Sequence, residues 1–157
     1  MDKAIVLSVD AESHVSAAVD MTRDLCQDSG DRVIVLHVHE FAVGRWGRMR
    51  VDCGEGQGEA LVKEIVTGLK DAGITAEGEI REAQFGHIAG DILAAADDND
   101  ARIIVLGSGG RADLPHLPFG GVSNRLLHMA RRPVLIVPRQ SGAKAAKAQA
   151  GAEAAAR

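Results

Sequence analysis

ARIIVLGSGG, residues 101–110, joins a short apolar run, residues 101–106, to a cluster of glycines. The run is continuous rather than alternating and is rich in β-branched residues, which is typical of a parallel strand buried on both faces of its sheet. The glycines that follow have no Cβ, so their backbone N–H groups can approach an anion closely. We therefore predict a buried strand whose carboxyl end leads into an anion-binding loop.

Three other apolar runs have the same character. They span residues 4–9, 32–39 and 133–138, and a weaker alternating run at 75–83 is typical of a strand nearer an edge. Apolar positions recur at helical spacing in four segments between the strands, residues 15–28, 59–72, 88–98 and 124–130. This alternation predicts an α/β fold: a single, doubly wound, Rossmann-like sheet of about five parallel strands with helices on both faces.

Two regions do not follow this alternation. Residues 43–58 contain five glycines, three arginines and Trp46, the sole tryptophan, and are predicted to form a mobile excursion after the second strand. Residues 141–157 consist mostly of Ala, Gly and Lys and have no apolar stripe to bury, which predicts a disordered tail. Residues 1–140 are then expected to form one domain.

Composition narrows the class of protein. The chain has 157 residues, 46% hydrophobic and 3% aromatic, so it can bury one core built from Val, Ile, Leu and Ala. A formal net charge of −4 gives no general attraction for nucleic acid, and no stretch is long enough for a membrane span. We expect no nucleic-acid or membrane partner, and a cytoplasmic location because no apolar leader is present. The Arg131–Arg132 pair is expected to be solvated or to face one bound phosphate.

The segments after the strands indicate where a ligand would bind. In open α/β sheets, ligands bind outside the carboxyl ends of the strands, where the strand order reverses. Gly107 to Gly110 follow one strand, and Gly120 and Gly121 come directly before the last helix. A helix N-terminus adds unpaired N–H donors and a favourable dipole. The two glycine clusters therefore predict a phosphate-binding cradle at one edge of the sheet.

These residues carry a resemblance to a known family. The chain resembles the universal stress protein family over roughly residues 2–139, and the ATP-binding pattern of that family falls on Gly107, Gly110 and Gly120 with its spacing intact. The resemblance implies an adenine nucleotide alpha hydrolase-like fold. Further matching stretches are residues 5–10, 36–38, 86–92, 101–108 and 132–137.

The resemblance also implies a ligand and its contacts. The ligand is ATP, or alternatively ADP or AMP, with Mg²⁺ able to accompany the nucleotide. Asp10 would approach the ribose or adenine, Val38 would line the adenine pocket, and the glycine loop would wrap the phosphates. The implied nucleotide-binding residues are Val9, Asp10, Val38, Gly107, Ser108, Gly110, Arg111, Gly120, Gly121, Val122 and Ser123. A homodimer paired through the strand Val134–Val137 is implied as well.

The predicted function is regulatory nucleotide binding in the stress response. No nucleophile with a base and an orienting partner is evident, so neither catalytic residues nor metal ligands are assigned, and any ATP hydrolysis is expected to be slow. Two departures from the family pattern, Gly121 in place of Ser or Thr and Glu12 after Asp10, favour an alternative, a dimeric interaction module that binds no nucleotide. A weak ATPase or ATP-using transferase is the second alternative.

Two local patterns have competing interpretations. His37 and His39 lie two apart on a predicted strand and could bind a metal with Asp52 or Cys53, but the ligand set is incomplete, so one histidine under a helix and the other at the strand end are favoured. Residues 107–112 also fit a dinucleotide-binding fingerprint. That fingerprint should follow the first strand and lead directly into a helix, whereas prolines follow here, so the match is taken as accidental.

Overall fold

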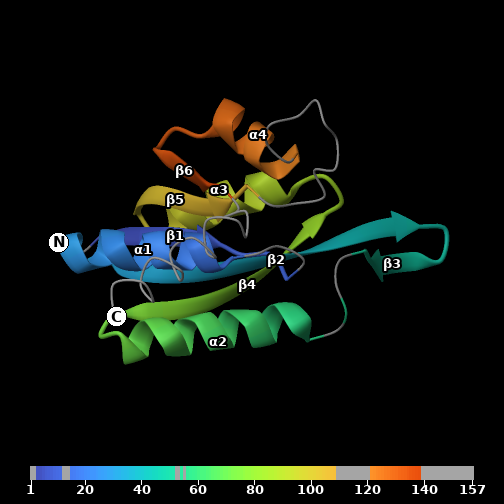
Figure 1. Cartoon of the computed structure of the whole chain (residues 1–157). Helices are drawn as coiled ribbons and strands as arrows, with labels where there is room; N and C mark the ends of the chain where they lie inside the picture. Colours follow the sequence, from blue (N-terminus) through green and yellow to red (C-terminus); the bar gives the residue numbers. More distant parts are fainter. Residues whose placement is uncertain (1–2, 12–14, 52–53, 55, 109–120, 139–157) are drawn as a thin grey trace, which may run out of the picture.

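The computed structural model describes residues 3–11, 15–51, 54, 56–108 and 121–138. Strands and helices alternate along these residues, with one additional strand after β2 (Figure 1). The elements are β1 Ala4–Ser8, α1 Ser16–Ser29, β2 Arg32–Gly44, β3 Gly47–Arg50, α2 Gln57–Asp71, β4 Ala76–Gln84, α3 Ile88–Asp98, β5 Ala101–Gly107, α4 Gly121–Met129 and β6 Val134–Val137.

The parallel strands form a doubly wound sheet in the order β4-β2-β1-β5-β6. From β1 the chain first builds outward through β2 and β4, then crosses back to β5 and β6 on the other side of β1. The strand order therefore reverses at β1, between β2 and β5. This confirms the predicted fold class and places the switch point where ligands bind in such sheets.

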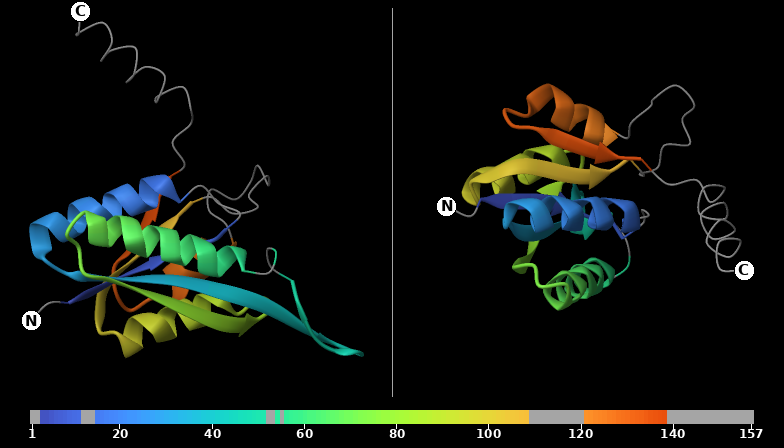
Figure 2. Two further views of the ribbon diagram at one scale, coloured as in Figure 1. Left: turned by 90° about the horizontal axis from the view of Figure 1, so that it is seen from below. Right: turned by 60° about the vertical axis from the view of Figure 1, so that its left-hand side comes forward.

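Helices cover both faces of this sheet. Figure 2 shows α1 and α2 together on one face, with α3 on the opposite face. Alternate residues of β1 belong to the two core clusters on either side of the sheet. Ile5 and Leu7 pack toward α1 and α2, whereas Ala4 and Val6 pack toward α3 and α4. Burial from both sides explains why the strand sequences are continuously apolar. No helix in the described part of the chain is long and apolar enough to cross a bilayer.

The region after β2 is the main correction to the predicted elements. Residues 43–58 were expected to be an irregular loop, but β2 continues to Gly44 and the chain returns as the antiparallel β3. Phe41 pairs with Arg50 on one edge and with Gln84 of β4 on the other. The hairpin therefore lies beyond the carboxyl end of β1 and projects from the domain (Figure 1).

This hairpin is held together by side chains on its surface rather than by a core. Trp46 at its tip is 97% exposed, and Val43 and Met49 are also exposed. The Arg48 guanidinium lies 3.6 Å from the centre of the Phe41 ring, a cation–π contact. The strand pattern was missed because these positions are rich in glycine and arginine and bury no apolar face.

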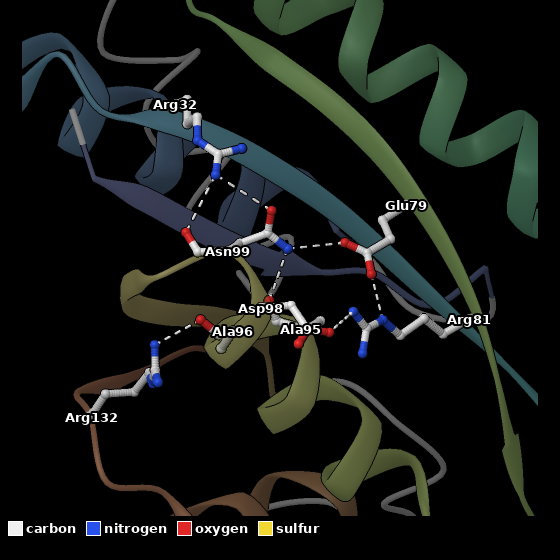
Figure 3. Close-up of polar contacts among 8 residues, drawn as sticks. All are labelled: Arg32, Glu79, Arg81, Ala95, Ala96, Asp98, Asn99 and Arg132. Atoms are coloured by element: carbon white, nitrogen blue, oxygen red, sulfur yellow. Dashed lines mark hydrogen bonds and ion pairs between the residues drawn. The ribbon is translucent and has the colours of Figure 1, made fainter. Parts of the chain in front are cut away.

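A polar network closes the amino-terminal edge of the sheet around the end of α3 (Figure 3). Arg132 donates to the backbone carbonyls of Ala96, at 2.8 Å, and Ala101. The Asn99 side chain donates to the Ala95 carbonyl at 2.9 Å. Carbonyls at the end of a helix have no partner within the helix, so these donors cap α3. Arg132 is therefore a structural cap at the edge opposite the predicted phosphate loop, not the solvated or phosphate-facing residue expected from the sequence.

Candidate functional site

The end of β1 is anchored to β2 at the switch point. Val9 donates its N–H to the Leu36 carbonyl at 2.8 Å, and the Val9 carbonyl lies 3.0 Å from Nδ1 of His37. Val9 is 4% exposed, whereas Asp10, the next residue, is exposed. The chain therefore presents the Asp10 carboxylate at the carboxyl edge, beside the strands between which the sheet order reverses.

The end of β5 lies next to this position. Gly107 is in register with Val137 of β6, and Ser108 donates its backbone N–H to the Val137 carbonyl at 2.8 Å. Both residues are half-buried. Of the remaining predicted loop residues, Gly110, Arg111 and Gly120 lie outside the described residues, so their roles stay predictions.

Helix α4 supplies the third part of the site. It begins at Gly121, three residues earlier than the segment 124–130 predicted, so Gly121, Val122 and Ser123 form its first turn. The N–H groups of a first turn have no partner within the helix and can serve an anion. Ser123 is only 4% exposed, so its side chain is covered by protein in this structure.

A small pocket of about 180 Å³ opens where the N-termini of α3 and α4 meet the end of β2. Apolar side chains make most of its wall, with one carboxylate and one guanidinium. The lining residues are Glu40, Gly86, Ile88, Ala89, Gly121, Val122 and Arg125. Only Gly121 and Val122 of these were predicted as site residues.

Glu40, Gly86 and Arg125 are connected across this pocket. Oε1 of Glu40 accepts the Gly86 N–H at 2.9 Å, and the Arg125 guanidinium donates to the Gly86 carbonyl. Gly86 has a φ of +81°, a left-handed conformation that favours glycine. The turn before α3 is thus held on both sides, by β2 and by α4.

Val38 lies behind the pocket rather than at its surface. It is 6% exposed and packs in the core cluster that also contains Ala83 and Ala89. Glu40 is two residues further along β2, so both side chains lie on the same face of the strand. This spacing was available in the sequence and could have pointed to Glu40, which lies nearer the carboxyl edge.

His37 and His39 both lie on the opposite face of β2, against α2. Neither is at the strand end, where one was predicted, because β2 continues to Gly44. His37 is 2% exposed, and its ring makes an edge contact with the His39 ring at 4.7 Å between centroids. His39 Nε2 lies 2.9 Å from Glu59 Oε1, and Arg50 Nη2 lies 2.5 Å from His39 Nδ1. Arg50 Nη2 also lies 3.2 Å from His39 Nε2. An arginine can only donate, so the shorter contact assigns Nδ1 as the acceptor and leaves Nε2 to donate to Glu59.

These contacts give the histidine pair structural partners. The backbone N–H of Glu59 and the His39 ring hold the pKa of the Glu59 carboxyl below its ordinary value. Within the described residues, no group of three His, Cys, Asp or Glu side chains could hold a metal ion. Asp52 and Cys53, the further ligands considered from the sequence, lie outside those residues.

Solved structures with the same fold are universal stress proteins. One from Archaeoglobus fulgidus has a TM-score of 0.68 and 21% identity, covering 87% of this chain and 99% of that chain. Another from Archaeoglobus fulgidus, in complex with dAMP, has a TM-score of 0.63 and 20% identity, covering 86% and 97% of the two chains. A universal stress protein in complex with cAMP has a TM-score of 0.65 and 19% identity, covering 87% and 97%.

Family models give a more direct assignment than these distant structures. No curated protein matches the chain. The model of the universal stress protein family, however, matches residues 1–138, which include every described element of the sheet and all four described helices. This chain belongs to the universal stress protein family.

Proposed function

We propose that this chain is a cytoplasmic regulatory protein of the stress response that binds an adenine nucleotide, with ATP as its ligand. The observation that carries the proposal is that the carboxyl ends of β1 and β5 lie side by side where the strand order reverses, with the first turn of α4 next to the end of the neighbouring strand β2. Two proteins of similar fold bind dAMP and cAMP, which supports an adenine ligand.

The described part of the site fits such a ligand. The first turn of α4 offers backbone donors and a favourable dipole for phosphate oxygens. Apart from its chain neighbours and the backbone of its own helix, no described residue has an atom within 4 Å of the position that a Cβ on Gly121 would take. Asp10 would approach the ribose or the base, and any Mg²⁺ would accompany the phosphates.

Calorimetric titration of the full chain with ATP, ADP and AMP tests this proposal. We expect saturable binding to one site per chain, and ATP to bind most tightly because it offers the most phosphate contacts. Nucleotide retained through purification would add the ultraviolet band of adenine to the absorbance of the protein. A flat titration with all three nucleotides, together with no adenine band, would contradict the proposal and favour an interaction module without a nucleotide.

A serine at position 121 is expected to strengthen nucleotide binding. Gly121→Ser adds the hydroxyl that the family pattern places here, and no described residue outside its own helix and chain neighbours would clash with the new Cβ. One neutral hydrogen bond contributes about 0.5–1.5 kcal/mol, so the Kd for ATP should fall by up to about tenfold. Gly121→Ala is the matched control, because it makes the same backbone change without the hydroxyl. Equal Kd values for the two variants would place the phosphates away from residue 121.

We further propose a homodimer formed through β6. Within the described residues β6 pairs only with β5, and its sequence, Val134 to Val137, is wholly apolar. An apolar edge strand left open invites association, and pairing with the same strand of a second copy would cover it. Sedimentation equilibrium should give twice the chain mass of 16.5 kDa. A monomer mass at micromolar concentration would contradict this assembly.

A further inference from the structure

The pocket between β2, α3 and α4 contains a carboxylate with no role in the proposed phosphate site. Glu40 reaches this pocket from β2, and its Oε1 is fixed by the Gly86 N–H at 2.9 Å. Among the described residues no hydrogen-bond partner is found for Oε2. One oxygen therefore positions the carboxylate, and the other remains to accept a hydrogen bond from a ligand.

The orientation of this carboxylate is set by a second residue. Arg125, in the second turn of α4, donates to the carbonyl of Gly86, the same residue whose N–H holds Glu40. The turn at Gly86 thus cannot move without breaking a bond to β2 or to α4. Because α4 also begins with the proposed phosphate donors, Arg125 fixes the distance between those donors and the Glu40 carboxylate.

The size and lining of the pocket suit a single ring system. Its volume is about 180 Å³, and Ile88, Ala89 and Val122 provide apolar contact surfaces. Ligand pockets commonly combine such walls with a few fixed polar groups that decide orientation and specificity. Here the carboxylate is the acceptor, and an ionised carboxylate can only accept.

We propose that Glu40 selects the base of the bound nucleotide by accepting a hydrogen bond from an exocyclic amine, and that Arg125 is the positioning residue for this contact. This inference rests on the proposed nucleotide-binding function. Adenine carries an amine at C6, whereas hypoxanthine and guanine carry a carbonyl oxygen there. A carbonyl facing the Glu40 carboxylate would place two acceptors together, so a site of this kind rejects the 6-oxo base.

Titration of the full chain with ATP and ITP tests the role of Glu40, because the two ligands have identical phosphates and ribose. We expect the wild-type protein to bind ATP at least about tenfold more tightly than ITP, as for loss of a hydrogen bond to a charged group. In Glu40→Gln the amide oxygen can still accept from Gly86, and the amide nitrogen then offers a donor to the base. The ratio of the two Kd values should fall to about one or invert.

Two further variants complete the test. Glu77→Gln is the control: it changes an exposed carboxylate near the amino-terminal end of β4. The ratio of the Kd values for ATP and ITP should stay as in the wild type. Arg125→Met should lower the ratio, because it frees the turn that positions Glu40. An equal loss of affinity for both nucleotides in Arg125→Met would instead indicate a phosphate contact and overturn its positioning role.

The outcomes separate the two proposals. A wild-type protein that binds both nucleotides, with a ratio unchanged in Glu40→Gln, would overturn the base-selection role and leave nucleotide binding intact. A wild-type protein that binds neither nucleotide would overturn the proposed function itself. Preference for ITP in the wild type would show that the carboxylate meets a ring N–H instead of an amine, and would overturn the assignment of adenine.

Discussion

The Gly58→Ala variant is expected to be destabilised by about 3 kcal/mol, the upper end of the usual cost of overpacking a core. A Cβ on Gly58, in the first turn of α2, would lie 2.2 Å from Cδ2 and 2.4 Å from Nε2 of His37. The His37 ring has little freedom to move, since its Nδ1 bonds to the Val9 carbonyl and the ring packs edge-on with the His39 ring. Either α2 lifts from the sheet or His37 releases the end of β1.

Gly68→Ala is the matched control, because it makes the same substitution in the same helix. No atom of the described residues lies within 4 Å of the position of its Cβ, and replacing glycine by alanine inside a helix contributes about 0.5–1 kcal/mol of stability. Urea unfolding followed by far-ultraviolet circular dichroism should therefore move the two midpoints in opposite directions. Similar midpoints for both variants would mean that α2 does not pack on His37 as described.

The second large effect is expected at Asp31, at the amino-terminal edge of the sheet. Its side chain is 7% exposed, and it accepts hydrogen bonds from the Lys3 N–H at 3.1 Å and from the Arg102 guanidinium. Asp31→Asn keeps the shape but removes the charge that both donors meet. Charge-assisted hydrogen bonds contribute about 1.5–3 kcal/mol, so the variant should lose about 2 kcal/mol at neutral pH.

This loss should disappear in acid. Burial raises the pKa of Asp31, but hydrogen bonds from Ser29, Arg102 and Lys3 and the Arg102 charge outweigh it and hold the pKa below its ordinary value. A carboxylate whose pKa is lower in the folded state than the ordinary value of about 3.9 stabilises the protein above that value. The contribution is lost as the pH falls through the folded-state pKa.

Urea midpoints of wild type and Asp31→Asn should therefore differ at pH 7 and converge as the solution is acidified below about pH 4. Asp71→Asn, at an exposed position near the end of α2, should stay within about 0.5 kcal/mol of wild type. A gap between wild type and Asp31→Asn that is constant with pH would show that packing, not charge, makes Asp31 important.

Most of the fold could be predicted from the sequence because the sheet is buried on both faces. Continuous apolar runs occur where strands lie between two helical layers, so β1, β5 and β6 were predicted within one or two residues of their observed ends. Helix α3 has the predicted bounds, Ile88–Asp98, because its apolar positions recur regularly. The hairpin carries no such signal, since its residues are stabilised by strand pairing and surface contacts.

The candidate site could be predicted only in part, because some of its contacts join residues far apart in the sequence. Residues that follow one strand, such as Asp10 and Ser108, could be predicted from their place after an apolar run. The contacts of Glu40 and Arg125 with Gly86 join residues 46 and 39 positions apart, on a strand, a helix and the turn before α3. No local spacing encodes such a meeting, which depends on the angle at which α4 approaches β2.

The position of Trp46 has a practical consequence for experiments in solution. As the only tryptophan, 97% exposed at the tip of the hairpin, it is surrounded by water in the folded chain and would be so again after unfolding. Its fluorescence should therefore change little on denaturation and be a poor reporter of folding. A blue shift of its emission would instead signal that another molecule has covered the hairpin. Trp46 is therefore an intrinsic fluorescent probe for binding at that tip.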